Sequence, residues 1–325
     1  MATRTDLTHT LEVDLEQYRR ELTGYCYRML GSGFEAEDAV QETMVRAWRN
    51  IGKLESPAAL RSWLYRIATN VCLDMTQASQ RRARAMDMTD PQTADAIVPD
   101  PISESFFIQP VPDARVMPTA GDPAELAAEK ETLRLAFVAA LQHLPARQRA
   151  VLILREVLRW QATEVAELLE TSVASVNSAL QRARATMDEL DLDASGPSEV
   201  EDEKAQEFLA KYMDAFERYD INSLVALLAD DVRFSMPPFP MWLQGPGEVH
   251  KWMLGNGIGC KDSVVVSTWA NGCPAVANYK PDGKGGYMPW AVAVLEIGDD
   301  KIVGVHNFIG DHVFETFGLP LQPEV

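Results

Sequence analysis

The segment from Leu144 to Arg184 restricts the possible folds of this chain more than any other part of it. If the stretch that begins at Val173 is a helix, each residue advances about 100° around the axis. One stripe of that helix is then apolar and suited to packing, whereas the opposite side carries polar residues. The apolar stripe consists of Val176, Leu180, Ala183 and Met187, and Ser175, Ser178 and Arg182 lie opposite.

A shorter helix is predicted just before this one, at residues 163–170, where Val165, Ala166, Leu168 and Leu169 supply a packing face. Ser172 follows it and is a suitable N-cap for the second helix. Two helices joined in this way are typical of a helix-turn-helix. Taken alone, the segment fits either a DNA-binding element or a plain structural hairpin.

Length and composition are those of a globular protein with two or three domains, since the chain has 325 residues, 46% of them hydrophobic and 24% charged. No apolar run is long enough to span a membrane and no signal-peptide core is present, so we expect a cytoplasmic protein. The four cysteines lack metal-ligand spacing, which predicts buried free thiols, no metal site and no disulfide framework. We also expect no cofactor.

The net charge of −18 is unevenly distributed along the chain. Residues 1–84 carry 12 basic and 11 acidic side chains, and residues 123–190 carry 8 and 9. The excess acid lies in residues 85–122, with 1 basic and 7 acidic side chains, and in residues 191–325, with 9 and 21. The two nearly neutral segments can therefore still present local basic surface to DNA phosphates.

These shifts in composition also predict the domain boundaries. Residues 85–122 are rich in proline and acid without a sustained period, which indicates an extended linker, and residues 191–202 form a shorter one. The linkers separate helical units at 1–84 and 123–190 and a C-terminal domain at 203–325. In the last of these, helices are predicted at 203–219 and 221–228, followed by a curved antiparallel sheet with strands at 232–236, 263–269, 275–279, 288–297 and 301–308.

The N-terminal unit is predicted to contain helices at 18–30, 35–50 and 58–84. In the third helix a packed face is flanked by Arg66, Asn70 and Gln77, and an arginine cluster follows at residues 81–84. Such a flank suits strand-separated DNA, which needs hydrogen bonds for its bases and positive charge for its phosphates. A solvated amphipathic face is the alternative.

Three motifs in order now support a family resemblance. Residues 36–48 (AEDAVQETMVRAW), residues 60–74 (LRSWLYRIATNVCLD) and the helix-turn-helix resemble an extracytoplasmic-function (ECF) sigma factor of the sigma-70 family. This resemblance covers residues 14–190 and implies two all-α sigma domains, a helical bundle and a helix-turn-helix, that bind bacterial core RNA polymerase and promoter DNA. It would make the protein a promoter-specific transcription initiation factor rather than an enzyme.

The C-terminal domain resembles an α+β SnoaL-like cone of the NTF2-like fold, on residues 228–242 (LADDVRFSMPPFPMW) and 304–309 (GVHNFI). The whole chain is therefore similar to ECF sigma factors with a fused SnoaL-like extension, among which the mycobacterial SigG type is most similar. Another such subgroup has a glycine-rich stretch after the first strand, where this chain has Met236, Pro237 and Pro238.

The resemblance also implies site residues. Matching positions place the polymerase contact on Glu37, Asp38, Gln41, Glu42, Met44 and Arg46, although a solvated helix face is the alternative for the acidic residues. The family captures a flipped promoter base in the loop at about residues 50–59, and its −10 contacts match Arg66, Asn70, Arg81 and Arg82, whereas Trp63 fits core packing better. The expected −35 contacts are Ser175, Asn177, Ser178, Gln181 and Arg182.

Two departures from the family pattern affect the helix-turn-helix. Relatives typically carry Lys and Arg at the positions of Asn177 and Ala179, so this chain should make fewer phosphate contacts. Relatives often have Gly where this chain has Glu170, so the turn should be built differently.

The role of the C-terminal domain is left open between two classes. One is a fused regulator that docks its net charge of −12 on the arginine clusters at residues 81–84 and 182–184, with or without an unknown small ligand. The other is a SnoaL-like enzyme or ligand-binding module attached to a DNA-binding module. The candidate pocket residues are Trp242, His250, Trp290 and His306, and no catalytic residue is assigned. In the family, the linker between the sigma domains threads through the polymerase.

Overall fold

The computed structural model describes residues 15–54, 56–78, 81–190 and 202–323 and divides into two compact units. The first unit is helical and contains the described residues up to Arg81, Ala114–Leu133 and the chain from Phe137 to the second linker. The second unit contains the C-terminal domain together with Arg82–Asp113 and Arg134–Ala136. Most of the segment that was expected to be an extended linker therefore folds with the C-terminal domain.

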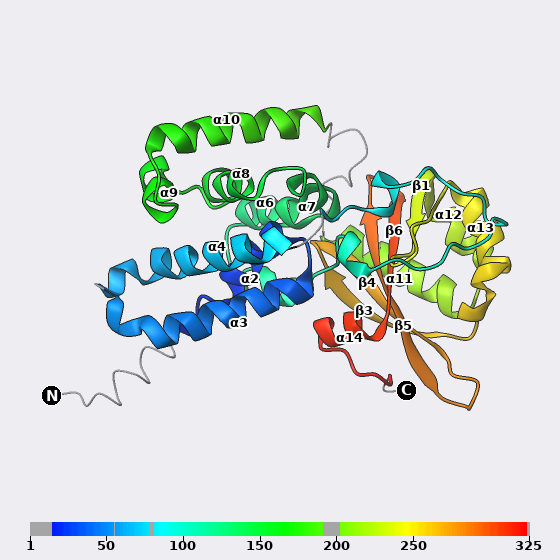
Figure 1. Ribbon diagram of the computed structural model, residues 1–325. Coiled ribbons are helices and arrows are strands. Elements are labelled where there is room, and N and C mark those ends of the chain that lie inside the picture. Colours follow the sequence, from blue (N-terminus) through cyan, green and yellow to red (C-terminus); the bar gives the residue numbers. More distant parts are fainter. Residues whose placement is uncertain (1–14, 55, 79–80, 191–201, 324–325) are drawn as a thin grey trace. The chain divides into compact units, whose positions relative to one another are not determined.

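Three antiparallel-packed helices begin the helical unit, α2 (Arg19–Leu30), α3 (Gly33–Asn50) and α4 (Leu60–Ala78) (Figure 1). Gly31 ends α2 in the left-handed conformation with φ 71°, and the side chain of Ser32 caps α3 by accepting a hydrogen bond from Glu35 N. The three predicted helices are confirmed, but α4 ends before the predicted Arg84. Residues 82–84 are not helical because Ala83 pairs with Phe107 in a parallel β-bridge.

The remainder of the helical unit carries the helix-turn-helix. Short helices α5 (Asp113–Val116), α6 (Pro123–Leu133) and α7 (Leu135–Leu141) precede α8 (Ala146–Leu152), which continues into a π-helical turn at Ile153–Val157. The motif itself is α9 (Ala162–Leu168) and α10 (Val173–Glu189), with Ser172 as the N-cap of α10. The predicted stripe is confirmed at Val176, Leu180 and Ala183, which are buried.

The C-terminal domain combines helices with one six-stranded sheet. Helices α11 (Asp202–Glu217) and α12 (Ile221–Ala226) precede β1 (Leu228–Ser235), β2 (Trp242–Gln244) and α13 (Pro246–Leu254). Next come β3 (Val264–Ala270), β4 (Cys273–Pro281), β5 (Tyr287–Ile297), β6 (Ile302–Ile309) and α14 (Asp311–Phe317). The order across the sheet is β2-β1-β6-β5-β4-β3.

The expectation of an antiparallel sheet was wrong for one pair, because β1 and β6 run parallel. These strands are far apart in the sequence, so their pairing is decided by the sheet and not by a hairpin. Three further elements were not predicted from the sequence: β2, which has only three residues, α13 and α14.

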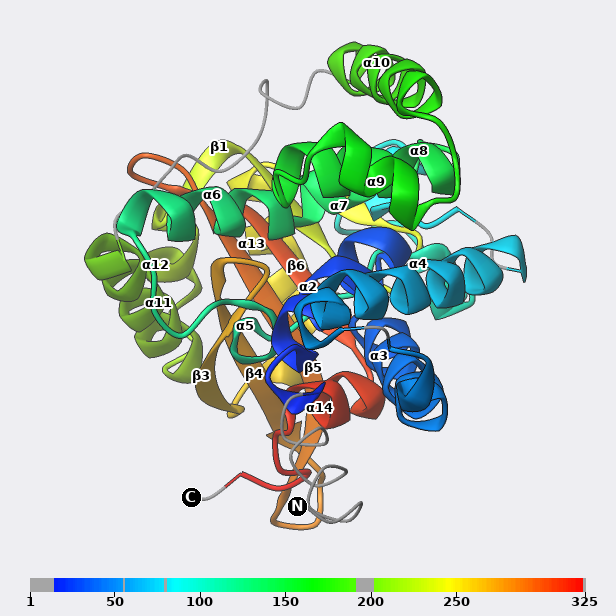
Figure 2. The same cartoon turned by 90° about the vertical axis from the view of Figure 1, so that its left-hand side faces the viewer.

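The two faces of the sheet have different cores. On the inner face α11 packs across β3, β4 and β5, and apolar side chains such as Phe208, Tyr212 and Leu295 form the main core (Figures 1 and 2). On the outer face Trp242 packs with Ala85 and Phe107 of the 82–113 segment. Strand alternation therefore sends the side chains of β1, β2, β5 and β6 into two separate environments.

Residues 82–113, which we call the strap, are fixed to the C-terminal domain by backbone and side-chain hydrogen bonds. Gln92 N donates to Trp242 O at 2.8 Å, Ala94 N donates to Glu248 Oε2 at 2.7 Å, and Ile102 N donates to Pro238 O at 3.0 Å. Phe107, Ile108 and Val111, from the apolar patch of the strap, are no more than 2% exposed.

Three further expectations concern single residue types and membrane spans. Cys26, Cys72 and Cys273 are buried free thiols, and Cys260 is half-buried. Among the described residues, no group of three potential ligands could hold a metal ion. None of the described helices is both long and apolar enough to cross a membrane. The predicted linker at 191–202 lies outside the described residues, except that α11 begins at Asp202.

Candidate functional site

Helix α3 presents its predicted contact residues in two different ways. Asp38, Gln41 and Glu42 are exposed along the helix, which is the arrangement that a partner surface requires. Met44, in contrast, is 9% exposed and belongs to the core, so it is not accessible in this conformation. The two remaining predicted residues are held in ion pairs, Glu37 with Arg115 at 3.1 Å and Arg46 with Glu42 at 2.6 Å.

Two large exposed side chains on α3 were not among the contact residues predicted from the sequence. Phe34 is 55% exposed and Trp48 is 54% exposed, at opposite ends of the helix. They share one helical face with Asp38 and Gln41, because Phe34 lies four residues before Asp38 and Trp48 lies seven residues, about two turns, after Gln41. That spacing could have revealed them, because exposed aromatic residues beside acidic ones are typical of protein interfaces.

The predicted −10 residues Arg66 and Asn70 lie on α4, with Asn70 exposed and Arg66 half-buried. Arg66 is engaged inside the helical unit, where its Nη2 donates to Glu167 O of α9 at 3.1 Å. Trp63 is half-buried and lines a cleft, so it is not a fully buried core residue as the sequence favoured.

That cleft has a volume of about 700 Å³ and lies between α4, with the turn before it, and α9, with the segment 158–160 that precedes α9. Trp160 anchors the two sides together, being 7% exposed with its ring centroid 5.0 Å from that of Tyr65. The Arg61 guanidinium lies 5.3 Å from the Tyr65 ring and 5.4 Å from the Trp160 ring. Aromatic and cation–π contacts therefore hold α4 against the helix-turn-helix segment.

The predicted −35 residues Ser175, Asn177, Ser178, Gln181 and Arg182 are all exposed on α10. Ser175 is also bonded to the N-cap, with its Oγ 2.9 Å from Ser172 Oγ. Before α10, Glu170 has φ 51°, a left-handed conformation that glycine adopts without strain. The turn thus keeps the geometry for which relatives use glycine, with a different residue.

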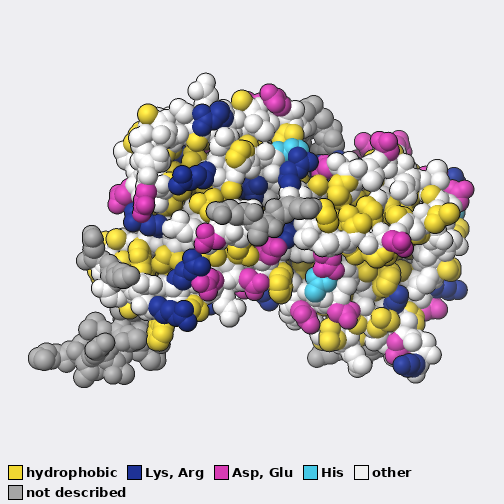
Figure 3. All heavy atoms as spheres, in the orientation of Figure 1, with side chains coloured by type: hydrophobic (Ala, Val, Ile, Leu, Met, Phe, Trp, Pro, Cys, Tyr) yellow, Lys and Arg dark blue, Asp and Glu magenta, His cyan; other side chains and the backbone are white. Residues whose placement is uncertain are grey.

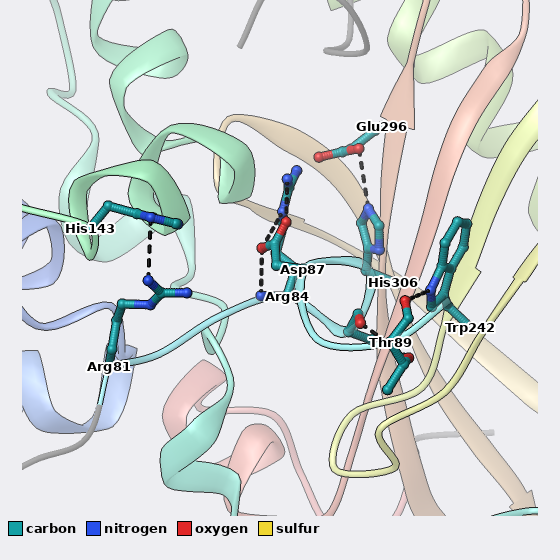
Figure 4. Close-up of polar contacts among 9 residues, drawn as sticks. Arg81, Arg84, Asp87, Thr89, His143, Trp242, Glu296 and His306 are labelled. Atoms are coloured by element: carbon teal, nitrogen blue, oxygen red, sulfur yellow. Dashed lines mark hydrogen bonds and ion pairs between the residues drawn. The ribbon is translucent and has the colours of Figure 1, made fainter. Parts of the chain in front are cut away.

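The arginines that follow α4 have separate environments. Arg81 is exposed, and its Nη1 lies 3.3 Å from His143 Nδ1 (Figure 4). Arg82 is only 4% exposed and donates to the carbonyl oxygens of Glu104 and Phe107 at 3.3 and 3.1 Å. In this conformation Arg82 is a structural residue of the strap, and DNA cannot reach it. On the face shown in Figure 3, basic side chains form separate groups with acidic ones between them.

The four candidate pocket residues come from four different elements of the C-terminal domain, β2, α13, β5 and β6. Trp242 and His306 both stand beside Ser235 on the outer face of the sheet, as the strand registers show, and the strap covers Trp242. His250 lies on α13. Trp290 lies in β5, where Lys280 Nζ is 3.3 Å from its ring centroid. The grouping of these four residues in one pocket stays a prediction.

A buried chain of polar side chains lies on the outer face of the sheet. Ser235 Oγ lies 2.9 Å from His306 Nδ1, and His306 Nε2 lies 3.1 Å from Glu296 Oε2 (Figure 4). Burial alone would raise the pKa of Glu296, but the charge and hydrogen bond of His306, with the charges of Arg233 and Arg84, lower it to about 2. Glu296 is thus ionised in the folded domain. No local sequence pattern indicates this residue, because its partners come from other strands.

Comparison with known proteins assigns each of these parts. Residues 15–82 match Sigma-70 region 2, residues 134–187 match Sigma-70 region 4, and residues 209–305 match the SnoaL-like domain. Over 310 residues the chain is 40% identical to the ECF RNA polymerase sigma factor SigG of Mycobacterium tuberculosis, covering 94% of this chain and 82% of that protein. The chain belongs to the ECF sigma factor family.

A second relative is consistent with this family in both sequence and structure. The sigma factor SigJ of Mycobacterium tuberculosis is 26% identical over 252 residues, or 74% of this chain and 72% of SigJ. The crystal structure of SigJ has the same overall fold, with a TM-score of 0.60 and 22% identity over 95% of this chain and 99% of that one. The predicted fold class and the resemblance are thereby confirmed. As an ECF sigma factor, the protein is a transcription initiation factor that binds core RNA polymerase and promoter DNA.

Proposed function

We propose that this sigma factor contacts core polymerase through the exposed face of α3 and promoter DNA through α4 and α10, and that its SnoaL-like domain regulates initiation by holding the strap. The observation that carries this proposal is the membership of residues 82–113 in the SnoaL-like unit. The segment that joins region 2 to region 4 is thereby bound to a third domain.

The α3 surface has the chemistry of a polymerase contact. Asp38, Gln41 and Glu42 provide exposed polar and acidic groups that can attract a basic partner surface. Phe34 and Trp48, near the two ends of α3, provide exposed apolar area that a partner protein could cover. Met44 would take part only by supporting the helix from the core.

Promoter contact would require the helical unit to open. Arg66 is bonded to the carbonyl of Glu167, and Trp160 is buried against Tyr65, so the −10 side of α4 faces α9. The five −35 residues on α10 are already exposed. We therefore infer that −35 binding precedes full access to the −10 residues.

The strap contacts support regulation by the SnoaL-like domain. Besides its backbone hydrogen bonds, the strap accepts a hydrogen bond from Trp242 Nε1 through Thr89 O at 2.8 Å, and Glu104 Oε2 lies 3.0 Å from His312 Nε2. A strap bound in this way cannot thread through the polymerase until these contacts break. The proposal includes two further means of controlling initiation. One is an unknown small ligand, and the other is docking of the acidic C-terminal domain on Arg182 and Arg184.

Charge reversal on α3 tests the polymerase contact. The double variant Asp38→Lys/Glu42→Lys should weaken binding to purified core polymerase at least tenfold, because it turns an acidic surface basic. The matched control is Glu207→Lys/Asp214→Lys on α11, which makes the same charge change on exposed residues of the other unit. Equal binding by the two double variants would refute the α3 assignment.

The regulatory role needs a separate measurement. Trp242→Phe keeps an aromatic ring but removes the N–H that Thr89 accepts, and should raise transcription from a promoter mapped for this protein. Transcription equal to that of the unaltered protein across a range of salt concentrations would refute regulation through the strap.

A further inference from the structure

The cleft between α4 and α9 has the volume of a small-molecule site. It measures about 700 Å³, and sites for small ligands in proteins occupy about 300–1,000 Å³. Both walls belong to the helical unit, and α9 lies beside α4 in Figures 1 and 2. Two aromatic and three basic residues line the cleft: Trp63 and Trp160, and Arg61, Arg66 and Arg159. Aromatic walls with a few polar groups are typical of ligand sites.

Arg159 is the basic residue of the lining that is most available to a ligand. Its side chain is exposed, and its guanidinium has no hydrogen-bond or ion-pair partner among the described residues. Its backbone is left-handed with φ 57°, a conformation that glycine adopts more easily. Other residues pay about 1–3 kcal/mol in such regions, and they concentrate at functional sites. An arginine at this position, lining a cleft, therefore indicates a role for its guanidinium.

The other charged residues of the lining are partly engaged. Arg61 pairs with Glu21 at 3.0 Å, and Arg66 Nη2 donates to Glu167 O at 3.1 Å. A guanidinium has five N–H donors, so Arg66 retains donors for a ligand. The two acidic side chains of the lining are Glu164, which is bonded to the N-cap of α9, and Glu167. Three arginines and two glutamates leave one excess positive charge, which favours an anion over a cation.

The aromatic side chains determine what kind of anion fits. Trp63 is half-buried, so part of its indole is accessible from the cleft. Trp160, in contrast, is 7% exposed and already packed against Tyr65. A planar ring can therefore stack on Trp63, while an acidic group of the same molecule meets Arg159 and Arg66. A base, a sugar and a phosphate together satisfy these groups and fill more of the cleft than a single-ring acid does.

We propose that this cleft binds a free nucleoside monophosphate, with its base on Trp63 and its phosphate on Arg159, and that the ligand holds α4 and α9 together. Trp63 belongs to α4 and Arg159 to the segment before α9, so the complete site exists only while the helical unit is closed. A ligand that binds one arrangement increases its population. Bound nucleotide should therefore reduce the access of promoter DNA to α4. The inference names the chemistry of the small ligand in the proposed function and rests on that function for its regulatory meaning.

Isothermal titration calorimetry of AMP and CMP with the purified full-length protein tests the site without polymerase or promoter DNA. At least one of them should bind with a Kd below about 1 mM. Arg159→Gln should weaken that binding at least about tenfold, because it removes a charged hydrogen-bond donor. Trp63→Leu should weaken it about fivefold through lost stacking, and Trp63→Phe, which keeps a ring, should weaken it less. The matched control is Arg49→Gln, which removes an exposed arginine in the last turn of α3, outside the cleft lining.

Two further ligands identify the chemistry and its source. Adenosine and cytidine lack the phosphate and should bind at least about tenfold more weakly than the monophosphates. Equal affinity for nucleoside and monophosphate would refute the anion site. A single-stranded oligodeoxynucleotide presents the same groups within a DNA strand. If it binds in a manner that Arg159→Gln weakens while neither monophosphate binds, the cleft is a DNA site and the proposal is overturned.

The locking role has its own measurement. A monophosphate that binds should lower transcription from a promoter mapped for this protein, and it should do so less in Arg159→Gln. Binding without any effect on transcription would refute this role.

These outcomes are separate from misfolding and from regulation through the strap. Because Arg159 is exposed, Arg159→Gln should keep the thermal unfolding midpoint of the unaltered protein. No binding of either monophosphate up to about 10 mM, or affinity in Arg159→Gln within about twofold of that of the unaltered protein, would overturn the site. Either result would leave the strap regulation tested by Trp242→Phe standing, whereas unchanged transcription in Trp242→Phe would leave nucleotide binding standing.

Discussion

Gly304→Ala should destabilise the SnoaL-like domain strongly although it adds only one methyl group. A Cβ on Gly304 would lie 2.6 Å from Glu296 Oε2 and 2.8 Å from His306 Nε2, inside ordinary van der Waals contact. Both atoms belong to buried side chains on neighbouring strands, so neither can move into solvent. The methyl group would therefore separate the two partners, which are 3.1 Å apart.

Two costs add at this position. Overpacking a close-packed interior costs about 1–3 kcal/mol. Breaking a buried ion pair costs about 3–5 kcal/mol when one charge loses all its compensation. Arg233 and Arg84 still act on Glu296, so the second cost should be partial. We expect a total loss of about 3–5 kcal/mol in the free energy of opening of the sheet.

Native-state hydrogen exchange of the β4–β5 amides measures this free energy for the C-terminal domain separately from the helical unit. Gly247→Ala is the matched control, because a Cβ at Gly247 meets nothing within 4 Å and the residue lies in α13. Alanine is favoured over glycine in a helix by about 1 kcal/mol, so the control should be neutral or stabilising. A loss below about 1 kcal/mol in Gly304→Ala would refute the close packing inferred here.

Three further predictions follow from single residues. Trp160→Ala should lower the stability of the helical unit by about 3–5 kcal/mol, because it removes a buried ring. It should also lengthen the distance between spin labels on α4 and α10. The control Trp48→Ala removes an exposed ring and should change neither the stability nor this distance. Glu170→Gly should raise the thermal stability of the helical unit by about 0.5–1 kcal/mol, since glycine relieves the left-handed φ of 51°; a fall would show that the Glu170 side chain contributes to folding. Because the folded pKa of Glu296 is lowered to about 2, its ionised form stabilises the domain above the ordinary carboxyl range. That contribution, on the order of 3 kcal/mol, is lost as the pH falls from about 4.5 to 2, so Glu296→Gln should flatten this part of the stability curve measured by urea unfolding.

Local patterns in the sequence were sufficient for most of the helical architecture. The stripe at Val176, Leu180 and Ala183 and the cap at Ser172 depend on residues at most four positions apart, and both are present in the structure. Five strands were predicted near their observed positions for the same reason, because alternation and turn residues are local signals. The parallel pairing of β1 with β6 has no local signal and was missed.

Tertiary structure decides that residues 82–113 fold with the C-terminal domain. Its proline-rich, acidic composition indicated an extended linker, since the sequence shows no partner for Phe107. The partner of Phe107, Trp242, lies more than a hundred residues further along the chain. The three sequence motifs thus identified the family by resemblance, and periodicity predicted the helices of the two sigma domains, because both kinds of signal depend on neighbouring residues. Burial of Arg82, the Ser235–His306–Glu296 chain and docking of the strap required distant strands to meet, and only the folded sheet brings them together.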